Sequence, residues 1–231
     1  MKLLIKFPTR QRKALFFSTL QKYITMASGK HEIEIIVSMD ENDETMNNPE
    51  VRQKLDDLVA AGNDIKYFYG HSTNKIEAIN ADMDKASDDW DMVFNGQDDM
   101  IPLVHGYDDL MLSKLAEHFP DTDGVLWLDD HYMGFATNCT IVSAGRKYYD
   151  RFGYLYNPEY KSLFADNEYT EVIQANGRYV YIKDDIVKHD WVGQNQSLDP
   201  LLQHNEQPWL YAHDKMIFEK RKSQGFPVNK E

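Results

Sequence analysis

Short apolar runs alternate with helical patterns along the first hundred residues. The apolar runs have the length of buried strands and occupy residues 3–7, 33–37, 65–69 and 91–94. Between the first two runs, Phe16, Leu20 and Tyr23 recur at the spacing of one helix face. Asn48 and Asn74 mark two further helix starts, because an Asn side chain caps free backbone amides. The alternation predicts parallel strands joined by crossover helices.

The pattern changes after Pro102. Beyond it we expect a helix near 104–117, strands at 125–128 and 140–143, an aromatic-rich stretch, and a tail helix near 211–222. No internal repeat or low-complexity linker separates two units. The sequence therefore predicts a single α/β domain over residues 1–231, with a mixed, mostly parallel central sheet flanked by helices. Its parts are a first half (1–103), a second half (104–198) and a tail with a helix (199–231).

The composition is that of a protein that folds throughout, with 42% hydrophobic and 27% charged residues. No apolar run approaches the length needed to cross a bilayer, and residues 2–7 suit a strand better than a signal-peptide core. The lone cysteine, Cys139, cannot form an internal disulfide. We expect a cytoplasmic protein without membrane insertion.

A formal net charge of −13 disfavours a nucleic-acid partner, because contact with phosphates depends on clustered Lys and Arg. An anionic ligand therefore needs a local basic site. The dense basic stretch beside a predicted strand contains Arg10, Arg12 and Lys13. It is either such a site or a solvated helix face, and a local patch would leave nucleic acid open as a partner.

Polar residues follow each of the four predicted strands. They are Pro8, Thr9 and Arg10 after the first strand, Asp40 after the second, Asn74 and Lys75 beyond the third, and Gln97, Asp98 and Asp99 after the fourth. Because the carboxyl ends of parallel strands meet at one edge, we expect these residues to converge on one crevice. Arg10 or Lys75 would suit a diphosphate, and Asp40 would accept hydrogen bonds from a base or ribose.

The pair Asp98 and Asp99 forms a hard oxygen site, which suits Mg²⁺ or Mn²⁺ better than zinc. Adjacent Asp residues are also common in solvated turns, and this chain has five other such pairs. What distinguishes Asp98 and Asp99 is their place after the fourth strand of the alternating series. The pair Asp129 and Asp130 also follows a predicted strand and is the main competitor.

Taken in this order, the residues resemble GT-A-type glycosyltransferases similar to family 2, over about residues 1–190. The resemblance implies that the first half binds a nucleotide sugar and the second half an acceptor. It also implies that Asp98, with Asp99 second, binds a metal ion that bridges the diphosphate. The chain departs from the family at Gly96, where an additional Asp often stands.

The resemblance also implies a catalytic base and a third metal ligand downstream. Asp166 and Glu168, at the start of a short predicted helix, are similar to the acidic acceptor motif of the family, with Asp166 as the base. Their alternative role is structural, since acidic groups stabilise helix starts. His189 follows a short apolar run and is either a metal ligand or a structural histidine.

These expectations favour a metal-dependent glycosyltransferase that uses Mn²⁺ or Mg²⁺. It would move a sugar from a nucleotide-sugar donor, a UDP-sugar by preference, to a hydroxyl acceptor, and the resemblance implies inversion. One alternative is a sugar-nucleotide nucleotidyltransferase, although its Gly-rich, Arg-containing loop is absent after the first strand. The other is a binding module in which Gly96 marks a decayed active site.

Overall fold

The computed structural model describes residues 1–131, 138–190 and 200–227. The first hundred residues form the predicted alternation. In chain order the elements are β1 (Lys2–Pro8), α1 (Lys13–Thr25), β2 (Glu32–Asp40), α2 (Pro49–Ala60), β3 (Asp64–Gly70), α3 (Lys75–Asn80) and β4 (Met92–Asn95). Asn48 and Asn74 cap α2 and α3, since their side chains accept hydrogen bonds from Val51 N and Glu77 N.

The remaining elements follow β4. They are β5 (Met100–Pro102), α4 (Tyr107–His118), β6 (Val125–Leu128), β7 (Ser143–Gly145), α5 (Arg146–Asp150), α6 (Ala165–Asn176), β8 (Tyr179–Ile182), β9 (Val187–His189), α7 (Pro200–Asn205) and α8 (Pro208–Ser223). The strand expected at 140–143 begins later than predicted, since β7 starts at Ser143 and ends at Gly145. A Cβ at Gly145 would lie 2.2 Å from Thr122 O, so this close approach requires glycine.

One seven-stranded sheet runs through the molecule in the order β3-β2-β1-β4-β7-β6-β8. The pairs β1–β2, β2–β3, β1–β4 and β6–β8 are parallel, and β7 is antiparallel to both β4 and β6. The predicted mixed, mostly parallel sheet is therefore confirmed. The division at residue 103 stays a prediction, because both halves contribute strands to this sheet.

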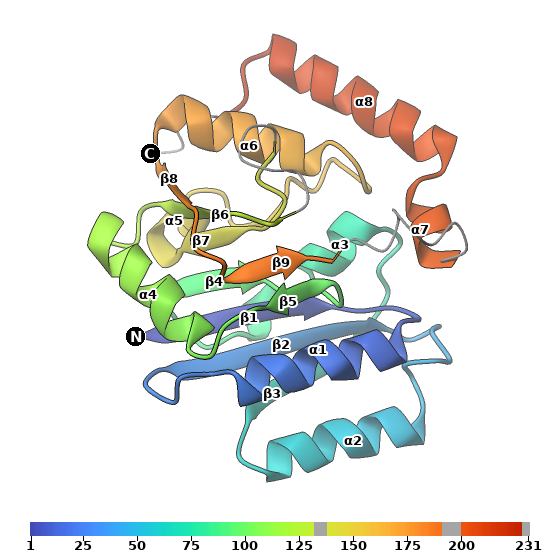
Figure 1. The fold of residues 1–231 in the computed structure, drawn as a ribbon. Helices are drawn as coiled ribbons and strands as arrows, with labels where there is room; N and C mark the ends of the chain where they lie inside the picture. The colour runs from blue at the N-terminus through green and yellow to red at the C-terminus, as the bar shows by residue number, and fades with distance from the viewer. Residues whose placement is uncertain (132–137, 191–199, 228–231) are drawn as a thin grey trace.

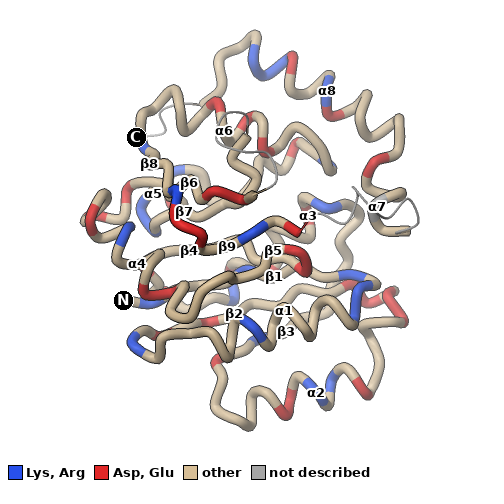
Figure 2. Tube along the Cα trace, in the orientation of Figure 1, with Lys and Arg blue, Asp and Glu red and all other residues tan. Residues whose placement is uncertain are grey.

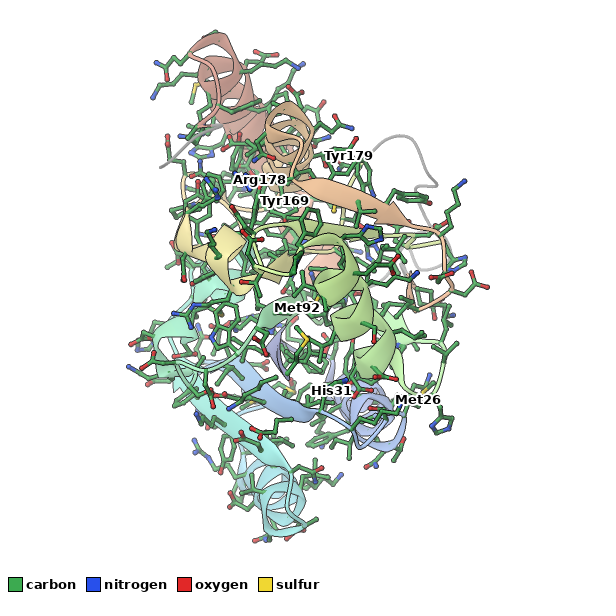
Figure 3. The ribbon with its side chains drawn as sticks, turned by 90° about the vertical axis from the view of Figure 1, so that its left-hand side faces the viewer. Met26, His31, Met92, Tyr169, Arg178 and Tyr179 are labelled. Atoms are coloured by element: carbon green, nitrogen blue, oxygen red, sulfur yellow. The ribbon has the colours of Figure 1, made fainter. Side chains whose placement is uncertain are left out.

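Helices cover both faces of the sheet (Figure 1). Residues of α1, α2 and α4 share one buried cluster with the sheet, and α3, α5 and α6 contribute to the cluster on the other face. Met92 of β4 lies in the first cluster, beside α4 in Figure 3. Helix α8 packs on the outside of α6. No described helix combines the length and hydropathy needed to span a membrane.

A separate two-stranded sheet lies in front of β1 and β4 in Figure 1, with β5 packed against α1. In it β5 pairs antiparallel with β9, so that Met100 lies opposite His189. The contact continues beyond the strands, because Asp190 N donates to Asp99 O at 2.8 Å. This pairing brings His189 to the segment that carries Asp98 and Asp99.

Candidate active site

The carboxyl ends of the parallel strands surround a cavity of about 660 Å³. This volume is in the ordinary range for a small-molecule site. Eleven of the predicted site residues line it: Pro8, Thr9, Arg10, Asp40, Asn74, Lys75, Gln97, Asp98, Asp99, Asp166 and His189. Four strand ends and two later segments thus converge, as the rule for parallel sheets requires.

The ends of β1 and β2 form one polar wall of the cavity. Arg10 and Asp40 make an ion pair at 2.5 Å, and Arg10 also donates to Asn42 Oδ1 at 2.9 Å. The second oxygen of Asp40 accepts from Ser72 N at 3.0 Å. Both oxygens of this buried carboxylate are therefore engaged. A ligand base or ribose that binds Asp40 has to share it with Arg10 or displace that contact.

Helix α1 holds the segment that carries the acidic pair. Thr19 Oγ1 donates to Asp98 O at 2.6 Å, and the buried Tyr23 hydroxyl donates to Met100 O. Thr9 Oγ1 donates to Asp98 Oδ1 at 2.9 Å and ties this carboxylate to the end of β1. The sequence pattern placed Tyr23 in the core, and the structure confirms this. Its hydroxyl has a second role, because the hydrogen bond to Met100 O holds the segment that follows Asp98 and Asp99.

Gly96 lies where the chain departs from the GT-A pattern. A Cβ at this position would lie 3.0 Å from Ile5 Cγ2 and 3.5 Å from the Tyr23 ring. The contact with Tyr23 is an ordinary one, but Ile5 would have to shift by a few tenths of an ångström to admit a side chain, and Ile5 is a buried core residue. Close packing against Ile5 therefore favours glycine at this position of the loop.

Asp99 has the least satisfied carboxylate of the pair. Its Oδ2 lies 3.4 Å from Arg12 Nη1, whereas its buried Oδ1 makes no hydrogen bond among the described residues. His189 Nε2 lies 4.0 Å from that Oδ1. Burial lowers the pKa of His189 below its ordinary value, and Asp99 opposes this shift. The ring is therefore neutral near pH 7, which is the form that binds metal ions.

These donors fit an incomplete site for a hard divalent cation. Carboxylate oxygens and a neutral imidazole suit Mn²⁺ or Mg²⁺, and an unbonded buried oxygen is otherwise costly. Within the described ranges, however, no group of three or more His, Cys, Asp or Glu residues is arranged to hold a metal ion. An ion bound here would need further oxygen ligands from water or from a diphosphate.

Helix α3 brings a cation to the same cavity. Asn74 uses its side-chain oxygen to cap α3, at 3.0 Å from Glu77 N, so its predicted ligand contact competes with a structural role. Lys75 is half-buried and forms no ion pair with any described residue. Its charge acts on both Asp166 and His189. Lys75 is therefore available to an anionic ligand.

Asp166 lies in the first turn of α6 and lines the cavity. It is not the N-cap, because that position is Phe164 with a positive φ of 60°. Asp166 Oδ2 accepts from Asn138 Nδ2 at 2.8 Å, and Oδ1 accepts from Asn167 N at 3.0 Å. Burial raises the pKa of Asp166, and the charge of Lys75 opposes the shift. Its carboxylate is thus a stronger base than an ordinary Asp.

The structure does not bring Glu168 into this cavity. Its carboxylate is buried and accepts from Arg221 at 2.8 and 3.0 Å, from the Tyr160 hydroxyl at 2.7 Å and from Asn157 at 3.0 Å. Glu168 does not line the cavity that Asp166 lines. Glu168 instead joins α6 to α8, so we correct its expected catalytic role.

Some cavity residues were not predicted individually. Arg12 belonged to the basic stretch and contacts Asp99, whereas its neighbour Lys13 pairs with Glu50 of α2 at 3.0 Å. Figure 2 shows acidic positions beside β5 and basic ones where α1 begins. Tyr156, from the aromatic-rich stretch, also lines the cavity, whereas the lining residues Thr140, Ser162, His204 and Asn205 carried no sequence signal.

Asp129 and Asp130, the competing acidic pair, accept hydrogen bonds from other residues of the fold. Asp130 Oδ2 accepts from Thr140 Oγ1 at 2.6 Å, and Asp130 O accepts from His189 N at 2.8 Å. Asp129 Oδ1 accepts from His131 N at 3.1 Å. Neither residue lines the cavity. Their position after β6 supports the wall that holds His189.

The sequence matches no family model and no curated protein. Solved structures nevertheless share the fold. A mannosyltransferase from Pyrobaculum calidifontis, in complex with GDP-Man and Mn²⁺, superposes with a TM-score of 0.61 at 13% identity, over 98% of this chain and 76% of that one. TarS from S. aureus superposes with a TM-score of 0.60 at 13% identity, over 99% and 74%.

A third structure is the Drosophila β-1,4-galactosyltransferase 7 in complex with manganese, UDP-Gal and xylobiose. Its TM-score is 0.52 at 16% identity, over 89% of this chain and 79% of that one. Identities this low establish the fold alone. The chain has the GT-A fold seen in these nucleotide-sugar glycosyltransferases, which confirms the resemblance at the level of architecture.

Proposed function

We propose that this protein is a metal-dependent glycosyltransferase that takes a sugar from a nucleotide-sugar donor and transfers it to a hydroxyl acceptor. The observation that carries the proposal is the convergence of Asp98, Asp99, Lys75 and Asp166 on one cavity at the carboxyl edge of a GT-A sheet. Fold neighbours in complex with GDP-Man or UDP-Gal and with manganese add support. We propose a UDP-sugar as the donor and inversion as the stereochemical course.

In this proposal the first half binds the donor. Asp40 and Arg10 meet the nucleoside, with Pro8 and Thr9 forming the adjacent wall and Gln97 the floor beside Asp98. Lys75, with no ion pair among the described residues, meets the diphosphate together with Arg12, because cations donate to phosphate oxygens. Asn74 positions Lys75 by capping α3.

Asp98, Asp99 and His189 would hold Mn²⁺ or Mg²⁺, with Asp98 as the principal ligand. When bound there, the ion supplies charge stabilisation for the diphosphate leaving group. The unbonded Oδ1 of Asp99 is the observation that favours a cation at this point. Thr19 and Tyr23 keep the acidic segment in place through its backbone carbonyls.

Asp166 acts as the general base. It takes the proton from the acceptor hydroxyl while that oxygen forms a bond to the anomeric carbon and the bond from that carbon to the diphosphate breaks. The raised pKa of Asp166 suits this role, since it increases the affinity of the carboxylate for the proton. Asn138 orients the carboxylate through Oδ2.

The test uses purified protein with Mn²⁺ and a panel of nucleotide sugars that includes UDP-galactose and GDP-mannose. We expect release of nucleoside diphosphate and a rise in Tm that depends on metal and nucleotide together. EDTA should abolish both. Pyrophosphate formed from a sugar phosphate and a nucleoside triphosphate would instead establish a nucleotidyltransferase. Binding without turnover of any donor would establish a binding module.

A further inference from the structure

One end of the cavity is built by elements that lie far apart in the chain. Ser162 and Leu163 line it from the segment before α6, and His204 and Asn205 line it from α7. Ile76 of α3 also lines the cavity, and its N–H donates to Lys161 O at 3.2 Å. The segment 161–163 is therefore the wall that joins the donor side to Asp166.

This wall is held from behind by a single buried carboxylate. Asp214 of α8 accepts hydrogen bonds from three successive backbone amides, Lys161 N at 3.0 Å, Ser162 N at 2.8 Å and Leu163 N at 2.7 Å. Asp214 has no exposed surface, and His213 Nδ1 lies 2.9 Å from its Oδ1. Hydrogen bonds to an ionised acceptor are strong, so the backbone of this wall is fixed before any ligand binds.

Ser162 stands out on this fixed wall. The residue lines the cavity but is only 6% exposed, and its Oγ is buried and makes no hydrogen bond among the described residues. A buried hydroxyl without a partner costs stability, since it has lost its bonds to water. The hydroxyl can both donate and accept, as can a sugar hydroxyl. The nearby cationic lining residues come from other segments, namely the β1 loop and the start of α3.

We propose that Ser162 is the hydrogen-bonding residue of a carbohydrate subsite, which binds a sugar hydroxyl beside the base Asp166. The subsite rests on the proposed function and deepens it, because the sugar belongs either to the nucleotide-sugar donor or to the acceptor. Leu163, next to it on the same wall, offers an apolar surface to a sugar ring. The fixed wall lets Ser162 select sugars by the position of one hydroxyl.

The test is the variant Ser162→Ala, with Ser143→Ala as its matched control. Ser143 also has a buried Oγ without a hydrogen bond, but it lies in β7 and does not line the cavity. Neither variant should lose stability, because each removes only an unbonded buried hydroxyl, and each Tm should equal or slightly exceed that of the wild type. Calorimetry with Mn²⁺ compares the binding of UDP, UDP-galactose and GDP-mannose. Enzyme assays compare donor hydrolysis with transfer to xylobiose and to galactose.

We expect Ser162→Ala to bind UDP normally. Either its affinity for the nucleotide sugar or its affinity for the acceptor should fall about two- to tenfold, which is the loss expected for one neutral hydrogen bond. Weaker binding of the nucleotide sugar relative to UDP assigns the subsite to the donor. Normal donor binding and hydrolysis with a raised acceptor KM assign it to the acceptor. If Ser162→Ala matches Ser143→Ala in every measurement while the wild type turns donors over, the subsite is overturned. If the wild type binds no nucleotide sugar, the proposed function fails with it.

Discussion

Asp99 at the carboxyl edge of the central sheet differs from two buried acidic residues at the amino edge in how fully its oxygens are bonded. At the amino edge, buried Glu34 of β2 accepts from Lys66 at 2.7 Å and Ser87 N at 3.0 Å. Asp123, just before β6, accepts from Arg151 at 2.7 and 2.6 Å. At the carboxyl edge, Asp99 keeps an oxygen without any hydrogen bond among the described residues.

This difference separates acids that stabilise the fold from acids that are placed for a ligand. A buried carboxylate with complete bonding adds to stability or is neutral, whereas an unbonded one costs free energy. Lys75 is a second charged residue at the carboxyl edge with incomplete bonding, since it forms no ion pair in the described part of the chain. Exchanges at the carboxyl edge should therefore change activity, and exchanges at the amino edge should change stability.

The largest effect is expected for Asp98→Asn. Loss of this carboxylate removes the main proposed metal ligand, so nucleotide binding should no longer depend on Mn²⁺. Nucleoside diphosphate release should fall on the order of 10³- to 10⁴-fold, since metal catalysis contributes several kcal/mol. Asp88→Asn, an exposed member of another Asp pair at the amino edge, is the control and should retain full activity. Metal-dependent donor binding that survives in Asp98→Asn would place the metal site elsewhere.

Asp166→Asn should separate binding from chemistry. The single amide oxygen can still accept from Asn138 while the bond from Asn167 N is lost, so we expect a small loss of Tm and an unchanged affinity for UDP and Mn²⁺. The kcat for transfer should fall roughly a few hundredfold, because an amide cannot take the proton. Glu171→Gln on the same helix, which removes only the partner of Lys222, is the matched control. A normal kcat in Asp166→Asn would exclude Asp166 as the base.

At the amino edge, Asp123→Asn should act on stability alone. It breaks a buried ion pair with Arg151 and Arg178, which typically costs about 3 kcal/mol, or roughly 10 °C in Tm for a chain of this size. Asp121→Asn removes an exposed pair with Lys147 and should shift Tm by much less. Calorimetry and donor turnover at 25 °C measure the two properties. A large loss of kcat in Asp123→Asn at unchanged Tm would contradict the assignment of amino-edge acids to stability.

The smallest effect is a pH dependence that involves Glu34. Burial alone would raise the pKa of Glu34, but hydrogen bonds from Lys66 and Ser87 outweigh it and lower the pKa to about 2 from 4.5. Because the folded-state pKa is depressed, the stabilisation is present above pH 4.5 and is lost as the pH falls toward 2. Urea unfolding between pH 5 and pH 2.5 should show a weaker acid dependence in Glu34→Gln than in the exposed-site control Glu32→Gln. Equal slopes would contradict the assignment.

The sequence alone determined the regular half of this protein. Strands at 3–7, 33–37, 65–69 and 91–94, and the caps Asn48 and Asn74, depend on periodicity and local hydrogen bonds, which neighbouring residues specify. The placement of Asp98 and Asp99 at a strand end followed directly. Parallel strands have to end at the same edge, so convergence with Asp40 and Lys75 was also predictable.

Only the tertiary structure decided the other half of the site. Glu168 had the same local signature as Asp166, but Arg221, 53 residues away, binds it on the far side of α6. Ser162 is positioned by Asp214, 52 residues away, and His189 reaches Asp99 through the pairing of two three-residue strands. Local pattern predicts which face of an element is buried. Which distant group satisfies a buried polar atom, and which atom is left for a ligand, depends on packing that no short stretch of sequence specifies.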